Sequence, residues 1–97
     1  MKPYRITRRA IEELQEATIY LEDVREGLGD ELVEAVFTAI DLICERPLSF
    51  PAVGKGVRRA KTKRFKYAVF FINHDDGIVI QSIYHASRRP LGFMEFE

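Results

Sequence analysis

The sequence contains one cysteine and no tryptophan, and its hydrophobic stretches are short. Cys44 alone cannot form an internal disulfide or supply a cysteine-based zinc cage. The two histidines, His74 and His85, lack metal-ligand spacing, and no glycine-rich phosphate loop is present, so we expect no metal and no cofactor. No apolar run approaches the ~18 residues that cross a bilayer. Residues 1–5 lead into charged sequence, which is not typical of a signal peptide. We therefore expect a reduced, cytoplasmic protein that does not engage membranes.

The composition is that of one folded domain. The chain has 97 residues, of which 46% are hydrophobic, with seven phenylalanines and four tyrosines. This is enough apolar material for one core and argues against disorder. The length leaves no room for a second domain. We expect a single domain over residues 1–97.

The formal net charge of zero hides a strong asymmetry between the two halves. Residues 1–50 carry six Lys or Arg and eleven Asp or Glu, whereas residues 51–97 carry nine and four. Between Lys55 and Lys66, seven of twelve residues are basic and none is acidic. Such an asymmetry indicates a face built for an anionic or acidic partner, although a merely solvated basic surface is an equally good interpretation of a basic run.

Two amphipathic helices are expected in the acidic half. Thr7 is a suitable N-cap, and apolar residues recur at steps of three and four from residue 10 to residue 24. The glycines of residues 27–29 break this helix, Asp30 can cap a second one, and Pro47 ends it. The apolar stripe of the second helix comprises Leu32, Val33, Val36, Phe37, Ile40, Ile43 and Cys44. A short turn between two such helices predicts an antiparallel hairpin, and Cys44 is interpreted as a core residue.

The basic half has the pattern of strands. Residues 48–54 are interpreted as a loop with Phe50 held against the core. The strand pattern from 57 to 71 is first basic and then aromatic, and residues 67–72 are apolar on both faces, as in a central strand. Residues 73–77 form a hairpin connection to a last strand at 78–85.

With a short strand expected at residues 1–6, the order is β-α-α-β-β-β. Neither half can bury its own apolar face, so we expect an α+β fold in which the helical hairpin packs on one face of a curved antiparallel sheet. The opposite face of that sheet, or its rim, would then display Arg58, Lys61, Lys63, Arg64 and Lys66.

Reactive side chains are concentrated where the last strand ends. Histidine is the residue type that most often serves as a general acid or base, so His85 is a candidate for that role, although a lone histidine at a strand end is more often structural. Arg88 and Arg89 have forks suited to phosphate oxygens. Simple strand alternation places Tyr84 on the face of Ile78, Ile80 and Ser82, and His85 on the opposite face with Val79, Gln81 and Ile83.

Four motifs together resemble the ParE/RelE superfamily of type II toxin–antitoxin toxins, and the ParE branch in particular. Residues 22–32 are similar to its Gly-Leu-Gly helix junction, and residues 45–51 to its Pro-x-x-Phe-Pro helix exit. Residues 57–71 are similar to its Arg…Phe-Pro-Tyr strand pair, and residues 85–90 to its His-x-x-Arg-x-Pro signature. Two positions depart from the pattern: Lys66 replaces a proline, and Arg89 replaces a frequently acidic residue.

The resemblance implies one RelE/ParE-like toxin domain with one of two activities. ParE-like toxins inhibit DNA gyrase and hence replication without a turnover reaction, whereas RelE-like toxins cleave mRNA in the ribosomal A site. The second activity would make His85, Arg64 and Arg88 catalytic. The tail at residues 91–97 is apolar and acidic and lacks the Tyr or Lys of a ribosomal site, which favours gyrase. A non-toxic RNA-binding module would also fit the basic strands.

The resemblance also implies partners. The target, which is gyrase or alternatively the ribosome with its mRNA, would contact Arg58, Arg59, Lys61, Lys63, Arg64, Lys66, Arg88 and Arg89. A ParD-like antitoxin with an acidic and apolar segment would cover the helix edge near Leu21 and Phe37 and the basic strand at Arg58 and Arg64, which gives a toxin–antitoxin hetero-oligomer.

Overall fold

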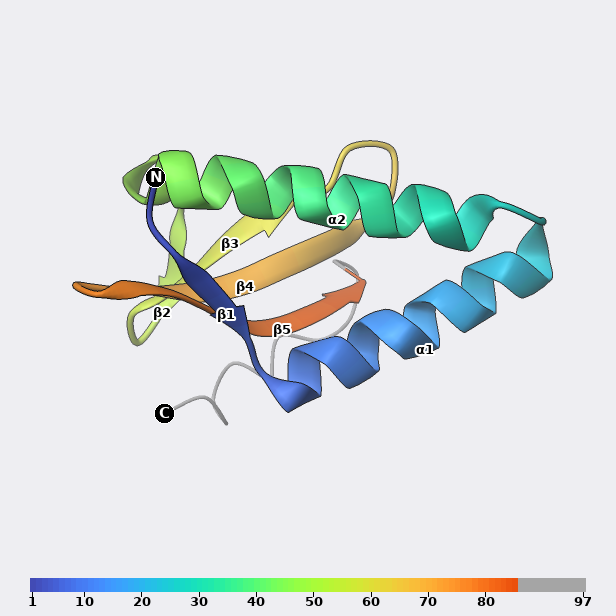
Figure 1. Ribbon diagram of the computed structural model, residues 1–97, viewed down its shortest axis with the longest axis horizontal. Helices are drawn as coiled ribbons and strands as arrows, with labels where there is room; N and C mark the ends of the chain where they lie inside the picture. Colours follow the sequence, from blue (N-terminus) through green and yellow to red (C-terminus); the bar gives the residue numbers. More distant parts are fainter. Residues whose placement is uncertain (86–97) are drawn as a thin grey trace.

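The computed structural model describes residues 1–85, which form two helices and a five-stranded sheet (Figure 1). The elements in chain order are β1 (Tyr4–Ile6), α1 (Arg8–Val24), α2 (Leu28–Glu45), a 3₁₀ turn (Pro47–Ser49), β2 (Ala52–Gly54), β3 (Val57–Lys61), β4 (Tyr67–His74) and β5 (Gly77–His85). The expected α+β order is confirmed, with one added strand. Neither helix is long and apolar enough to cross a membrane.

The sheet is mixed, in the order β1-β5-β4-β3-β2. β1 pairs with β5 in parallel, with Tyr4 opposite Ile78, while the other neighbours are antiparallel. The expectation of a wholly antiparallel sheet is therefore wrong. A strand of three residues has no pattern that distinguishes the two directions. Two hydrogen bonds flank the parallel pairing: the Ile78 amide donates to the Pro3 carbonyl at 2.8 Å, and the Thr7 amide donates to the Ile80 carbonyl at 3.1 Å.

The segment before β3, expected as a loop, contains the short edge strand β2. Ala52 pairs with Arg58, and Gly54 pairs with Val57 across a two-residue turn. Both turn residues, Lys55 and Gly56, have positive φ, as a tight hairpin of this length requires. Three residues of edge strand are too short to give an alternating pattern, so the sequence could not reveal them.

The two helices begin in different ways. Thr7 caps α1, as expected, because its hydroxyl accepts from the Ala10 amide at 3.1 Å. α2 begins at Leu28, before the expected cap at Asp30, with Gly27 as N-cap at φ +86°. The missing cap comes from α1, since the Glu22 carboxylate accepts from the amides of Gly27 at 2.8 Å and Gly29 at 3.0 Å. A carboxylate at a helix N-terminus is also favoured by the helix dipole.

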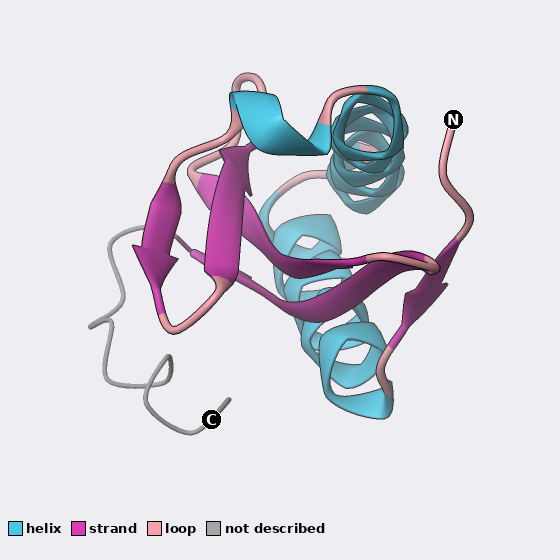
Figure 2. Cartoon of the chain, turned by 90° about the vertical axis from the view of Figure 1, so that its left-hand side faces the viewer, coloured by secondary structure: helices cyan, strands magenta, loops and turns pink. Residues whose placement is uncertain are grey.

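The helices pack against one face of the twisted sheet, and the main core lies between the two layers (Figure 2). β4 is central and buried on both faces, as expected: Val69 and Phe71 belong to the main core, whereas Ala68 and Phe70 belong to a second cluster on the other face. Phe50 packs edge-to-face on Phe71, with ring centroids 5.9 Å apart. Cys44 is a buried free thiol in the main core, and desolvation raises its pKa.

A β-bulge changes the faces of β5. Phe70 pairs with Ser82 but Phe71 pairs with Ile80, so Gln81 is an extra residue. An extra residue shifts the alternation by one. The isoleucines Ile78, Ile80 and Ile83 consequently all join the helix-side core, and Tyr84 joins the second cluster. The expected grouping of Tyr84 with Ile78 and Ile80 is wrong, although Tyr84 and His85 do point to opposite faces.

The α1–α2 junction predicts a strong effect of one methyl group. A Cβ on Gly29 would lie 2.8 Å from both the Thr18 carbonyl oxygen and its methyl carbon. The helix backbones cannot separate without losing packing, so we expect Gly29→Ala to lower the free energy of unfolding by about 1–3 kcal/mol in urea denaturation, despite the better helix propensity of alanine.

The matched control is Gly27→Ala, where a Cβ meets nothing within 4 Å and only the positive φ opposes substitution. That variant should lose about 1–2 kcal/mol from backbone strain alone. A Gly29→Ala variant as stable as the natural chain would contradict the close approach.

Candidate functional site

The β3–β4 connection, residues 62–66, exposes three basic side chains and buries Thr62. The Thr62 amide donates to the Tyr67 carbonyl at 2.9 Å, and its hydroxyl contacts the carbonyls of Phe65 and Tyr67 at 3.0 Å each. These bonds close a tight loop. The side chains that the loop exposes to solvent are Lys63, Arg64 and Lys66.

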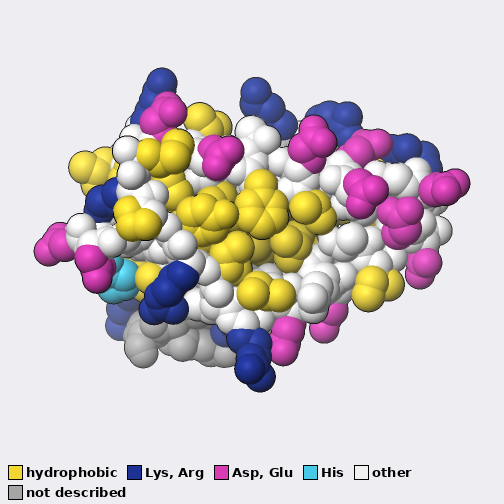
Figure 3. Space-filling view, in the orientation of Figure 1, with side chains coloured by type: hydrophobic (Ala, Val, Ile, Leu, Met, Phe, Trp, Pro, Cys, Tyr) yellow, Lys and Arg dark blue, Asp and Glu magenta, His cyan; other side chains and the backbone are white. Residues whose placement is uncertain are grey.

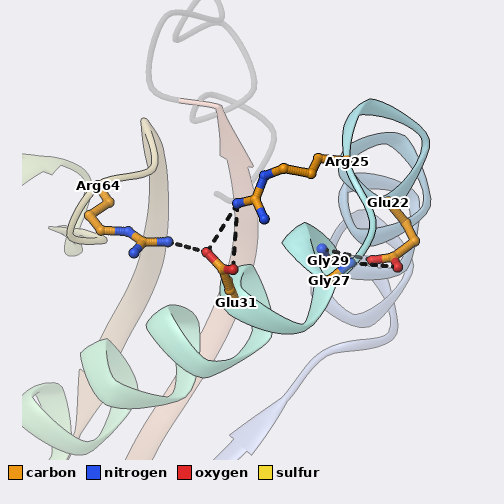
Figure 4. Close-up of polar contacts among 6 residues, drawn as sticks. All are labelled: Glu22, Arg25, Gly27, Gly29, Glu31 and Arg64. Carbon is orange, nitrogen blue, oxygen red and sulfur yellow. Dashed lines mark hydrogen bonds and ion pairs between the residues drawn. The ribbon is translucent and has the colours of Figure 1, made fainter.

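Arg64 has a left-handed backbone conformation, which is unfavourable for arginine. Its φ is +70°, which is rare for residues other than glycine. The guanidinium lies over the Phe65 ring, 5.4 Å from the centroid, and forms an ion pair with Glu31 of α2. Arg25, at the end of α1, reaches the same carboxylate at 3.5 Å (Figure 4). The hydrogen bond from Arg64 and the positive charge of Arg25 lower the pKa of Glu31 below its ordinary value of 4.5. Partial desolvation raises this pKa, but its effect is the smaller one.

A groove of about 280 Å³ lies between α2 and the basic connection. Its lining comprises Glu31, Glu34, Ala35, Thr38, Ala39 and Leu42 from α2, and Lys61, Lys63, Arg64 and Phe65 from the sheet side. The groove thus has an acidic rim, a basic rim and an apolar floor. Lys61 and Lys63 make no hydrogen bond or ion pair within residues 1–85, so these two cations are available to a ligand.

The predicted basic residues do not all share one face. Arg59 pairs with Phe70 of the second cluster, so it lies on the face away from the helices. Lys61 pairs with Ala68 of the same cluster, but it is the last residue of β3 and lines the groove beside α2 from the end of that strand. Arg58 pairs with Phe71 on the helix side, and its guanidinium donates to the Phe50 carbonyl at 2.7 Å. The expectation that Arg58 lies on the opposite face or rim is wrong, because strand alternation separates Arg58 from Arg59.

His85 lies in a second hollow, of about 390 Å³, between α1 and the end of β5. Its ring packs edge-to-face on Tyr67, with centroids 5.3 Å apart. The hollow is lined by Glu13, Glu16, Ala17, Tyr20, Tyr67, Ile83, Tyr84 and His85. Two glutamates and three tyrosines line this hollow together with the histidine, and none of the lining residues is Lys or Arg.

Glu13 joins α1 to the edge of β5 that β1 leaves uncovered. Its carboxylate accepts from the Ile83 amide at 2.9 Å and from the Ser82 hydroxyl at 2.5 Å, and Arg9 lies 3.6 Å from it. Both acceptor contacts satisfy donors on residues with no solvent exposure. Glu13 therefore replaces a missing neighbouring strand.

The predicted catalytic residues are divided between the two hollows. His85 lines the hollow beside α1, whereas Arg64 lines the groove beside α2. Arg88 and Arg89 lie outside the described residues. Within residues 1–85, no group of three or more His, Cys, Asp or Glu could hold a metal ion.

The predicted antitoxin contacts lie at or near the helical face. Leu21 and Phe37 are half-buried and pack against the main core. Figure 3 shows hydrophobic side chains gathered in the middle of this face, between the helices, and acidic side chains crowded at the end where the hairpin turns. Whether a partner covers Leu21, Phe37, Arg58 and Arg64 stays a prediction.

The sequence matches the family model described as ParE toxin of the type II toxin–antitoxin system parDE, over residues 4–90. That match spans nearly the whole chain. The chain belongs to the ParE toxin family. The ParE/RelE resemblance drawn from the four motifs is thereby confirmed. None of the curated proteins is significantly similar to this sequence.

Solved structures share the fold of this ParE-family chain at low identity. A chain of the chromosomal ParDE system from P. aeruginosa has 18% identity and a TM-score of 0.65, covering 88% of this chain and 96% of its own. In the E. coli RelBE toxin–antitoxin complex the values are 16% and 0.67, with 91% and 100% covered. For the isolated E. coli RelE toxin they are 15% and 0.67, with 99% and 96% covered.

Sequence reasoning missed three residues of the ParE-family site: Glu13, Glu31 and Thr62. The partners of Glu13 and Glu31 are 69 and 33 residues away in sequence, so no local pattern reports them. Thr62 had a usable signal, because threonine commonly bonds nearby backbone groups in turns.

The role of Glu13 predicts a loss of stability on truncation. Glu13→Ala leaves the buried Ile83 amide and Ser82 hydroxyl without their acceptor, so we expect a loss of about 1–3 kcal/mol in urea denaturation. Glu16→Ala, in the same hollow but exposed, is the control and should lose less than about 0.5 kcal/mol. Equal losses of stability in the two variants would show that Glu13 does not serve as the acceptor for the uncovered edge of β5.

The shared carboxylate predicts a measurable titration. In Arg64→Ala, the pKa of Glu31 should rise toward 4.5, and in Arg25→Ala it should rise less, as read from carboxyl NMR shifts. Because the pKa of Glu31 is lower in the folded chain than in the unfolded one, the pair stabilises the fold at neutral pH, and this contribution is lost as the pH falls through the folded-state pKa. An unchanged pKa in Arg64→Ala would show that the pair does not persist in solution.

Proposed function

We propose that this protein is a ParE-type toxin that inhibits DNA gyrase and so stops replication. The observation that carries this choice is the separation of His85 from the basic groove. Cleavage of an RNA phosphodiester needs an acid or base and several cations converging within about 3 Å of the reacting oxygens. Within residues 1–85, the hollow of His85 contains carboxylates and tyrosines instead.

A gyrase inhibitor has a weaker geometric requirement, namely an exposed surface of suitable shape and charge. The β3–β4 connection and the end of β3 supply one, where Lys61 and Lys63 have no ion-pair partner among residues 1–85 and lie beside an apolar floor. We propose that this surface contacts gyrase or its bound DNA. The match to the ParE toxin family model supports this choice.

Messenger RNA cleavage is the second candidate, and the observation that favours it is the gathering of Lys61, Lys63 and Arg64 at one groove. These are the types of group that bind a scissile phosphate. The likeness to RelE structures supports the shared fold and does not distinguish the activities.

We also propose an antitoxin partner. Two of the similar structures come from toxin–antitoxin systems, ParDE and RelBE. The apolar surface between the helices and the basic groove suit a segment that is both apolar and acidic. Such a segment would hide both the cations and the exposed hydrophobic side chains from other partners.

The deciding experiment measures gyrase directly. Purified protein should make gyrase accumulate linear DNA in a supercoiling assay, and Lys61→Glu with Lys63→Glu should reduce this accumulation about tenfold or more, because both charges are reversed at the contact. The matched control is Arg8→Glu, an exposed cation at the start of α1 outside both hollows, which should leave the accumulation unchanged.

A parallel assay with mRNA-programmed ribosomes tests the second candidate. A-site cleavage that His85→Ala abolishes, without linear DNA in the first assay, would replace the gyrase proposal by endoribonuclease activity. Silence in both assays would favour a non-toxic RNA-binding module.

A further inference from the structure

Arg64, the arginine that lines the basic groove, is already bound to an anion, and that anion belongs to the chain itself. The Arg64 side chain is 66% exposed, yet its guanidinium is engaged by the Glu31 carboxylate. Lys61 and Lys63, which line the same groove, have no such partner within the described residues. Of the three cations that line the groove, the Glu31 carboxylate thus neutralises only Arg64.

Helix capping does not explain this contact of Glu31. The start of α2 is capped by Glu22, whose two carboxylate oxygens accept from the amides of Gly27 and Gly29 (Figure 4). The Glu31 side chain points away from that cap, toward Arg64 on one side and Arg25 on the other. Its contacts are those of an anion between two arginines.

A carboxylate and a phosphodiester present similar oxygens to a guanidinium. The Glu31 side chain is 39% exposed, and exposed ion pairs are weak, so a phosphate arriving from solvent could take its place. The surroundings favour a nucleic acid over other anions, because Lys61 and Lys63 offer adjacent phosphate contacts and the Phe65 ring lies beneath the Arg64 guanidinium.

We propose that Glu31 is an internal competitor for Arg64, so that the basic groove binds a nucleic-acid phosphate at Arg64 only by exchange with the Glu31 carboxylate. Lys61 and Lys63 make the first contacts, and exchange at Arg64 adds one more. This inference rests on the proposed function only in that the groove meets a nucleic acid, which is the DNA bound by gyrase for the first candidate and the mRNA for the second.

The test measures binding of a fluorescein-labelled 20-nucleotide single-stranded DNA, and of the RNA of the same sequence, by fluorescence anisotropy. Glu31→Gln should tighten binding by about two- to fivefold more than Glu34→Gln does, which is the range that an exposed ion pair supplies. Glu34→Gln is a matched control, since it removes the same charge from the same groove without an ion pair to Arg64 within residues 1–85. The salt dependence of Glu31→Gln should also steepen by about 0.7, the contribution of one further phosphate contact on a single strand.

A double variant isolates Arg64. In Glu31→Gln with Arg64→Ala, the extra affinity should disappear, whereas Glu31→Gln with Arg25→Ala should keep it. Thermal melts of all variants confirm that each is folded at the assay temperature. Binding to neither oligonucleotide, even by Glu31→Gln, would overturn the inference.

Two further results would also overturn it. Equal gains from Glu31→Gln and Glu34→Gln would mean that only net charge matters. A gain in affinity for poly-glutamate but not for either oligonucleotide would mean that the groove serves an acidic protein. Because gyrase activity is not measured here, the proposed function can fail while this inference stands, and the reverse.

Discussion

The close approach of α1 and α2 at their junction determines where the charged groups of this fold can meet. Gly29 allows the start of α2 to contact Thr18, and Glu22 caps that start from α1. Because Glu22 already supplies this cap, the Glu31 side chain is not needed at the helix start. It forms an ion pair with Arg64 of the β3–β4 connection instead. The helical hairpin is thus the element that brings an acid of the first half to a base of the second.

The uncovered edge of β5 has a comparable effect on the other hollow. β1 pairs only with residues 78–80, so the following donors of β5 need another acceptor, which Glu13 supplies. The bulge at Gln81 then turns His85 toward α1 and the tyrosine hollow. A carboxylate needed for the strand edge and a histidine turned by the bulge therefore share one hollow, which has the composition of an acid–base cluster without the cations of a phosphate site.

The parts of the fold that sequence predicts are those encoded locally. Helical periodicity predicts both helices, Thr7 predicts the cap of the first, and the apolar run at 67–72 predicts the central strand. The start of α2, the direction of β1 and the faces of β5 depend on groups distant in sequence or on one extra residue in a ladder. The ion pair of Glu31 with Arg64 belongs to the same class, since neither residue type nor spacing distinguishes this glutamate from its neighbours in α2.

Some of the opposite charges of the two halves pair with each other within the chain, and others stay open to a partner. Part of the asymmetry is satisfied internally, because Glu31 of the acidic half neutralises Arg64 of the basic half. What remains for a partner is smaller than the sequence total and is localised: within the described residues, Lys61 and Lys63 line a groove with an apolar floor and have no internal acid. A partner that supplies anions there gains two contacts directly, and gains the third only by displacing a carboxylate. That order of events makes affinity depend on how closely the partner's anions are spaced, which distinguishes a regular phosphate backbone from a single acidic side chain.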